Sequence, residues 1–193
     1  MKNRLTILVD WDDVINDLMP KALELLNESH GTNYTLESFP EFNFSKYLPE
    51  ADSNALHAMF LSEELWNVLR PNQDAPETLK RMIADGHEVF LVTATHWKNV
   101  AYKMDWLAKH FPFIQWEQVI VTSRKDKVRG DWLIDDNPLN IKNHPYGRVC
   151  MDKPWNRSLN DEVYDIIRVK NLREAYEAIL VRENQEIELS QRE

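Results

Sequence analysis

The chain has 193 residues, of which 43% are hydrophobic and 28% are charged, and its formal net charge is -9. This balance is typical of one globular domain with a sizeable core, and the acidic excess argues against a sequence-independent grip on nucleic acid or on an anionic membrane. The single cysteine, Cys150, excludes an internal disulfide and favours a reducing compartment, and no signal peptide or membrane-spanning run is visible, so we expect a cytoplasmic protein.

The first predicted element is a strand over residues 5–9, indicated by an unbroken run of apolar and β-branched side chains. Three acids follow within four positions: Asp10, Asp12 and Asp13. Because unpaired acids are costly inside a buried strand, we expect them at its carboxyl end, where the chain leaves the sheet. Ligands bind at this edge of open α/β sheets.

A helix is predicted next, because apolar residues recur at helical spacing from about residue 15 to a turn at Gly31. The following segment is less regular and rich in aromatic residues, with two shorter helical stretches near 53–60 and 62–69. We interpret residues 16–74 as a small, mostly helical cap inserted after the first strand.

From residue 75 onward, helices and short apolar strands alternate. Helices are predicted over 75–84, 99–110 and from 172, and strands over 88–95, 118–122, 131–134 and 148–151. Beyond Arg182 the chain is polar, and we expect it to fray. The alternation predicts an α/β fold with a Rossmann-like parallel sheet flanked by helices, whose core comprises residues 1–15 and 75–193.

Candidate site residues follow the predicted strands. They are Asp10 and Asp12 after the first, Thr93 in the second, Lys125 after the third, and Asp135 and Asp136 after the fourth. A doubly wound sheet brings these strand ends to one edge, so we expect a single site. Clustered carboxylates repel one another and are held best around a hard cation, which indicates Mg²⁺.

Each side chain has a chemical use in phosphoryl transfer. Asp10 can act as metal ligand and nucleophile, and Asp12 can protonate a leaving oxygen and later activate water. Thr93 offers a hydroxyl and a backbone N–H to phosphate oxygens, and Lys125 supplies positive charge.

A structural interpretation exists for each residue taken alone. Acid pairs are common in loops, Thr93 could simply be a strand former, and Lys125 could be a surface lysine, with Lys127 as a nearby alternative. The pair Asp135-Asp136 could belong to a turn. Their occurrence together, in order and at strand ends, favours the site.

The set resembles the four motifs of the haloacid dehalogenase (HAD) superfamily. The first motif is similar to residues 10–14, the second to Thr93 after a hydrophobic strand, and the third and fourth to a lysine and an acidic pair. Most of the superfamily has a glycine after the second aspartate, where this chain has Asp13. That departure adds a negative charge beside the site and raises a question about the tight turn.

Two further likenesses are to the 5'(3')-deoxyribonucleotidases. The helical insertion after the first motif is similar to the cap of that family, and residues 124–136 are similar to its stretch from lysine to acid pair. The separation of 10 positions between Lys125 and Asp135 favours Lys125 over Lys127.

The resemblance implies a Mg²⁺-dependent phosphatase that forms an aspartyl-phosphate. Asp10 would attack the phosphorus of a nucleoside monophosphate, while Asp12 would protonate the sugar oxygen and then activate water. Mg²⁺ would be held by the Asp10 carboxylate, the Asp12 backbone carbonyl and Asp136, with Asp135 supporting them. Ala94 stands where a serine often contacts phosphate, so its backbone would take that role.

The substrate pocket is less sharply indicated. Phe42, Asn43 and Phe44 fall where the family places nucleobase-pocket residues, and their rings could stack on a base or pack the cap against the core. Arg157, after the last predicted strand, could contact phosphate, close the cleft or belong to a turn. Trp97 could face the cleft or cover the sheet.

We therefore expect an enzyme, a phosphoric monoester hydrolase of the 5'-nucleotidase type, whose partner is a small phosphomonoester, a deoxyribonucleotide. Two alternatives stay open: a HAD phosphatase for another small phosphomonoester, or a non-catalytic nucleotide-binding protein on the same scaffold. No nucleic-acid polymer and no membrane is expected as a partner, and a homodimer is compatible with the sequence. The preference for base and for the 5' or 3' ester does not follow from these residues.

Overall fold

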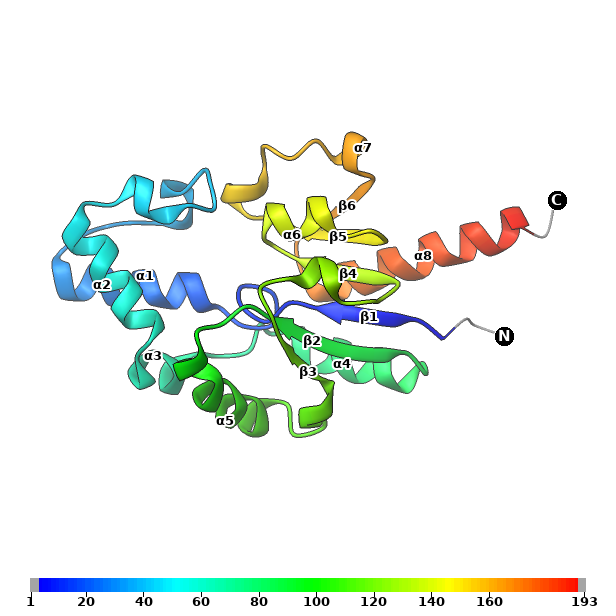
Figure 1. Ribbon diagram of the computed structural model, residues 1–193, viewed down its shortest axis with the longest axis horizontal. Helices are drawn as coiled ribbons and strands as arrows, with labels where there is room; N and C mark the ends of the chain where they lie inside the picture. Colours follow the sequence, from blue (N-terminus) through cyan, green and yellow to red (C-terminus); the bar gives the residue numbers. More distant parts are fainter. Residues whose placement is uncertain (1–3, 191–193) are drawn as a thin grey trace.

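The computed structural model describes residues 4–190 and contains a six-stranded sheet with helices on both faces (Figure 1). Every pair of neighbouring strands is parallel. The strands are β1 (Thr6–Val9), β2 (Glu88–Thr93), β3 (Val119–Val121), β4 (Trp132–Asp135), β5 (Gly147–Met151) and β6 (Ile166–Val169), in the order β3-β2-β1-β4-β5-β6. The predicted α/β fold is confirmed, and the strand that leads into the first acids lies in the middle of the sheet.

Strand β1 is apolar throughout because both of its faces are covered. Ile7 and Val9 belong to the main hydrophobic core, whereas Leu8 packs into a separate cluster on the opposite face, and all three side chains are fully buried. Alternation of successive side chains between the two faces of a strand produces this division.

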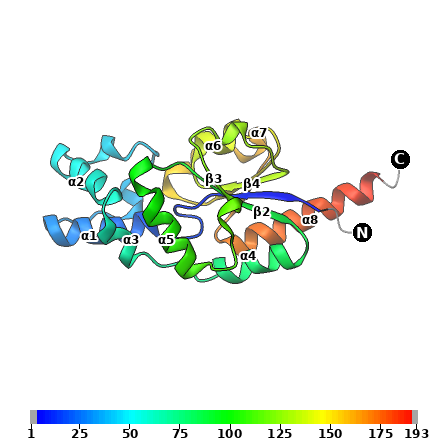
Figure 2. The same cartoon turned by 60° about the horizontal axis from the view of Figure 1, so that its bottom comes forward.

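Two helical layers cover the sheet, as the turned view in Figure 2 shows. The main core lies under α4 (Ala75–Ala84), α5 (Val100–His110) and α8 (Leu172–Ser190). The other face carries the short helices α6 (Pro138–Asn143) and α7 (Asp161–Tyr164). Among residues 4–190, no helix is long and apolar enough to cross a membrane.

Three further helices gather beyond the carboxyl ends of the strands: α1 (Leu18–His30), α2 (Glu50–Phe60) and α3 (Glu63–Val68) (Figure 1). Helix α1 ends at Gly31, whose φ of 66° lies in the left-handed region that glycine adopts readily. Asp52 of α2 accepts hydrogen bonds at 2.7 Å from Tyr34 and is paired with His30 at the same distance. These contacts tie α2 to the end of α1 without help from the sheet.

Several elements differ from those expected from the sequence. Strand β6 and helices α6 and α7 were not predicted, because they are short and lack a clear apolar period. The closing helix does not fray after Arg182 but continues to Ser190. Arg182 pairs with Asp165 at 2.9 Å, and Glu183 accepts a 2.7 Å hydrogen bond from Trp132, so tertiary contacts hold the polar end of α8.

Candidate active site

The loop after β1 has an aspartate in a backbone conformation that usually needs glycine. Asp13 has a φ of 59°, in the left-handed region. Its N–H donates to Asn16 Oδ1 (3.1 Å), and its carboxylate accepts from the N–H of Met19 (3.0 Å) in the first turn of α1. Burial raises the pKa of Asp13 to about 7. The aspartate found where most of the superfamily has glycine therefore links the site loop to the first helix.

Lys125 lies between two carboxylates and is almost fully buried. Its ammonium is 2.5 Å from Asp10 Oδ1 and 2.7 Å from Asp135 Oδ2. Burial disfavours the charged lysine, but Asp10 and Asp135 outweigh that effect and raise its pKa above the usual range. Both oxygens of Asp135 are also contacted by Asn140 Nδ2, at 3.3 and 3.0 Å. The alternative lysine, Lys127, is exposed.

An acidic cluster surrounds this lysine. One carboxylate oxygen from each of Asp10, Asp135 and Asp136 lies within 4.8 Å of the others. Burial, reinforced by Asp135, raises the pKa of Asp10 to about 7, and burial together with Asp10 raises the pKa of Asp136 well above its usual range. Both shifts arise first from burial and then from repulsion between neighbouring carboxylates, so the charged forms of these acids are costly without a cation beside them. The donors are all oxygen atoms, so the cluster fits a hard divalent cation.

Asp136 is held from the segment that follows β5. Its Oδ2 accepts a hydrogen bond from Trp155 Nε1 (2.8 Å), and its backbone carbonyl accepts one from Asn156 Nδ2 (2.8 Å). Both donors are fully buried. The orientation of Asp136 is therefore determined by residues that lie 19 and 20 positions later in the sequence.

Lys103 of α5 is a site residue that sequence reasoning missed. Its ammonium is 2.5 Å from Asp12 Oδ2 and donates to Thr93 Oγ1 at 2.7 Å, and the side chain is buried against the rings of Trp11 and Trp66. A signal was available, because Lys103 lies four residues before Leu107, on the apolar side of its helix. A lysine at such a position needs a buried acid as its partner.

A cavity of about 270 Å³ opens onto these groups. Its polar wall includes Asp10, Asp12, Asp13, Lys125 and Asp136, and its apolar wall includes Leu18, Met19, Phe42, Phe44 and Phe60. A second cavity of about 280 Å³ shares Asp12, Leu18, Phe60 and Ala94 with the first. The combined space suits a molecule with one anionic end and one flat, apolar end.

The remaining predicted site residues differ in whether they line the two cavities. Ala94 lines both cavities, whereas the Thr93 side chain is buried against Lys103. Asn43 is exposed and lies outside the lining of both cavities. Trp97 is 73% exposed and also lies outside, so it neither faces the described cleft nor covers the sheet.

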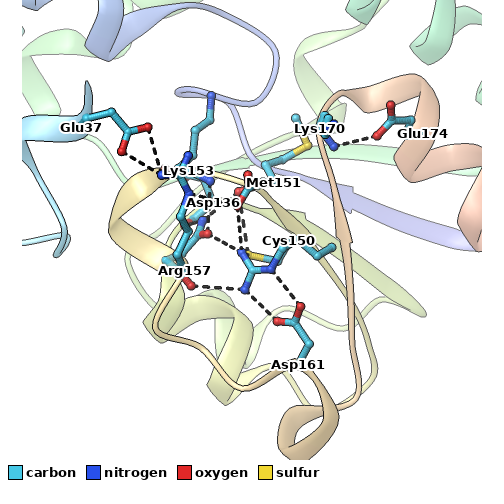
Figure 3. A network of polar contacts seen from close by, with 12 residues as sticks. Glu37, Asp136, Cys150, Met151, Lys153, Arg157, Asp161, Lys170 and Glu174 are labelled. Atoms are coloured by element: carbon cyan, nitrogen blue, oxygen red, sulfur yellow. Dashed lines mark hydrogen bonds and ion pairs between the residues drawn. The ribbon is translucent and has the colours of Figure 1, made fainter. Parts of the chain in front are cut away.

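Arg157 is paired with acids outside the cluster of Asp10, Asp135 and Asp136. It forms an ion pair with Glu37, at 2.8 Å, in the segment between α1 and α2 (Figure 3). The side chain is half exposed and does not line either cavity. This placement ties the segment after β5 to the segment between α1 and α2, and the roles expected for Arg157 stay predictions.

The chain is similar to known proteins over most of its length. Residues 3–185 match the family model described as 5' nucleotidase, deoxy (pyrimidine), cytosolic type C protein. A 5'(3')-deoxyribonucleotidase of Clostridium acetobutylicum is 26% identical over 158 residues, covering 82% of this chain and 87% of that protein. The enzyme of the same name from Bacillus subtilis is 25% identical over 176 residues, covering 90% and 98% of the two chains.

Solved structures share the fold at much lower sequence identity. A haloacid dehalogenase-like hydrolase from Streptococcus pneumoniae superposes with a TM-score of 0.62 at 12% identity, covering 93% of this chain and 100% of that one. A HAD family hydrolase from Deinococcus radiodurans gives a TM-score of 0.60 at 11% identity, with coverages of 95% and 98%.

Proposed function

The chain belongs to the family of 5' nucleotidase, deoxy (pyrimidine), cytosolic type C proteins and is a phosphomonoester hydrolase of HAD type, and we propose that it hydrolyses deoxyribonucleoside monophosphates. We further propose that the reaction passes through an aspartyl-phosphate on Asp10 and uses Mg²⁺. The observation that carries this proposal is the pairing of each central aspartate with its own buried lysine, Asp10 with Lys125 and Asp12 with Lys103, where both aspartates line one cavity.

In the first step, Asp10 acts as the nucleophile. Oδ1 already accepts hydrogen bonds from Lys125 and from the N–H of Trp11 (2.7 Å), and among residues 4–190 no donor contacts Oδ2. Oδ2 is therefore the oxygen that attacks phosphorus. The bond between phosphorus and the sugar oxygen breaks, and the Asp12 carboxyl gives its proton to that oxygen. The products are a free nucleoside and a phosphorylated Asp10.

In the second step, Asp12 reverses its role. Its carboxylate takes a proton from water, and the water oxygen attacks phosphorus while the bond to Asp10 breaks. Lys103 holds Asp12 in place through both steps, and Thr93 fixes the position of Lys103. Lys125 stays beside Asp10 and offers its charge to the phosphate oxygens.

A divalent ion would be held by the Asp10 carboxylate, the Asp12 backbone carbonyl and Asp136. It would supply the positive charge that draws phosphate oxygens into a cluster of acids. Asp135 supports this arrangement from outside, because Lys125 and Asn140 already occupy its oxygens. Oxygen ligands and the absence of cysteine or histidine from the described cluster favour Mg²⁺ over softer metals.

The nucleoside would lie along the apolar wall. Phe42, Phe44 and Phe60 face the same cavity as the acids, and aromatic rings stack on bases of any sequence. We propose that residues 16–74 act as the cap that carries this wall, over a core made of residues 1–15 and 75–193. The wall offers few polar atoms, so it supports a flat base more strongly than a sugar phosphate.

We also propose a cytoplasmic location, supported by a buried, unpaired Cys150. The expectation of a homodimer stays a prediction.

The test is a phosphate-release screen over deoxyribonucleotides, ribonucleotides and sugar phosphates, each with and without Mg²⁺, for wild type and Asp10→Asn. Wild type is expected to prefer deoxyribonucleotides and to need Mg²⁺, and the variant is expected to be inactive while still folded by circular dichroism. Turnover by Asp10→Asn would remove the nucleophile assignment. Faster cleavage of sugar phosphates than of any nucleotide would identify another small phosphomonoester as the substrate.

A further inference from the structure

Three consecutive residues after β5 connect the acidic cluster, the sheet and the helices above the strand ends. Trp155 contacts the side chain of Asp136, and Asn156 contacts its backbone. Arg157 reaches Glu37, in the segment between α1 and α2 (Figure 3). The nucleotidase reaction described above uses none of the three directly. Because these three neighbouring residues contact both Asp136 and Glu37, they connect the acidic cluster to residues 16–74.

The Trp155 side chain contacts both Asp136 and Phe44. Its indole N–H donates to Asp136 Oδ2 at 2.8 Å, and its ring meets Phe44 edge-on, with centroids 5.3 Å apart and planes at 73°. Phe42 approaches the same ring at 6.4 Å. The indole is 1% exposed, so neither contact can be exchanged easily for water. A single rigid ring thus joins the aromatic wall, Phe42 and Phe44, to an acid of the proposed metal site.

The surroundings of Trp155 hold it firmly. Asn156 donates to the backbone carbonyls of both Asp136 and Met151 at 2.8 Å, and its own side-chain oxygen accepts from Arg168 at 2.7 Å. Arg168 is in turn paired with Asp161 at 2.7 Å. Because the base of the link is rigid, displacement of the aromatic wall is transmitted to the indole rather than absorbed by the loop.

We propose that Trp155 is a positioning residue that couples the aromatic wall to Asp136, so that a nucleoside bound on the wall strengthens metal binding. This inference rests on the proposed function, because it takes Asp136 as a metal ligand and the wall as the base site. A nucleoside stacked on Phe42 and Phe44 orders the rings that contact Trp155, and the ordered indole holds Asp136 in its ligating orientation. Coupling of this kind is reciprocal, so the metal strengthens nucleoside binding by the same factor.

The experiment measures Mn²⁺ affinity from the electron paramagnetic resonance signal of the free ion, with and without saturating thymidine. Thymidine carries no phosphate, so any effect on the metal has to pass through the protein. In wild type, thymidine is expected to tighten Mn²⁺ binding about fivefold, at the low end of ordinary couplings between sites. An absence of this effect in wild type would overturn the coupling without the need for any variant.

Trp155→Phe retains a ring beside Phe44 but has no N–H for Asp136. We expect it to bind Mn²⁺ about tenfold more weakly, the usual cost of losing a hydrogen bond to a metal ligand, and to show no effect of thymidine although thymidine still binds. The matched control is Trp132→Phe, which removes another indole hydrogen bond, to Glu183 (2.7 Å), from the opposite end of β4. That control is expected to retain both the affinity and the thymidine effect.

Wild-type affinity or an unchanged thymidine effect in Trp155→Phe would overturn the inference. Equal losses in Trp155→Phe and Trp132→Phe would also overturn it, because they would reveal a general loss of packing. Failure of the proposed metal site gives a different result: Asp136→Asn would bind Mn²⁺ like wild type. Failure of the proposed substrate is detected separately, by the phosphate-release screen.

Discussion

Replacement of Lys103 by methionine is expected to slow catalysis about 100-fold in a protein that stays folded. Methionine has a similar length and a polarisable end, so it can keep contact with the rings of Trp11 and Trp66 that now flank the lysine at 5.3 and 5.2 Å. What it removes is the 2.5 Å ion pair with Asp12 and the hydrogen bond to Thr93. Asp12 then loses the contact that determines its position.

The costs to stability and to catalysis are of similar size in free energy. Breaking a fully buried ion pair costs about 3–5 kcal/mol of unfolding free energy. The Asp12 side chain is 23% exposed, so water can partly replace the ammonium, and we expect a loss of about 1–3 kcal/mol. For catalysis, a displacement of about 1 Å in a reacting group costs about 100-fold, equivalent to about 2.7 kcal/mol in the barrier.

The assay combines steady-state kinetics on a deoxyribonucleotide with urea unfolding of the same preparations. kcat is expected to fall about 100-fold, with a much smaller change in KM. Lys98→Met is the matched control, because Lys98 is an exposed lysine of the same region whose ammonium lies 5.7 Å from the ring of Trp97 and, within residues 4–190, is paired with no acid. A folded Lys103→Met protein with wild-type kcat would refute the assignment of Lys103 as the residue that positions Asp12.

Three further predictions concern the metal, the pH and the pocket. Mg²⁺ at about 100 times its Kd should add about 2.7 kcal/mol to the unfolding free energy of wild type and much less to that of Asp136→Asn, and equal gains in urea titrations would locate the ion elsewhere. In the metal-free protein, burial raises the pKa of Asp10 and Asp13 from 3.8 to about 7, so the folded state favours their protonated forms. The contribution of these two acids to the unfolding free energy should therefore be greatest below about pH 4 and be lost as the pH rises to about 7. In urea titrations across this range, the unfolding free energy should fall less for Asp13→Asn than for wild type. An equal or larger fall for the variant would contradict that reasoning. Phe42→Ala should raise KM for nucleotides but not for p-nitrophenyl phosphate, and equal changes for both would indicate damaged packing.

Much of the fold follows from local pattern. The unbroken apolar run before Asp10 could only be stable with both faces covered, and the structure places it as a central strand. Helix α4 occupies the predicted residues 75–84, because its apolar period is clear and Asp85-Gly86 ends it. Strand β6 was missed because an edge strand of four residues with an arginine inside it has no such signal.

The candidate site divides in the same way. Asp10, Lys125 and Asp136 could be named from the sequence because each follows a recognisable strand, and parallel strands end at one edge. Lys103 and Trp155 were not named. The position of Lys103 on the apolar side of its helix indicates a buried acid as its partner but not which acid, and the pattern around Trp155 indicates only packing. Each reaches its acid from another segment of the chain.

By itself, the sequence determined which strands are buried, which acids stand at their ends and which chemistry such acids can perform. These properties depend on neighbours within a few positions, where strand alternation and solvation costs act directly. Only the tertiary structure decided that Asp12 is paired with Lys103, 91 positions away, and that Asp136 is held by Trp155. Those partners depend on how the helices and loops pack against the sheet. Local sequence patterns do not indicate which distant segments this packing brings into contact.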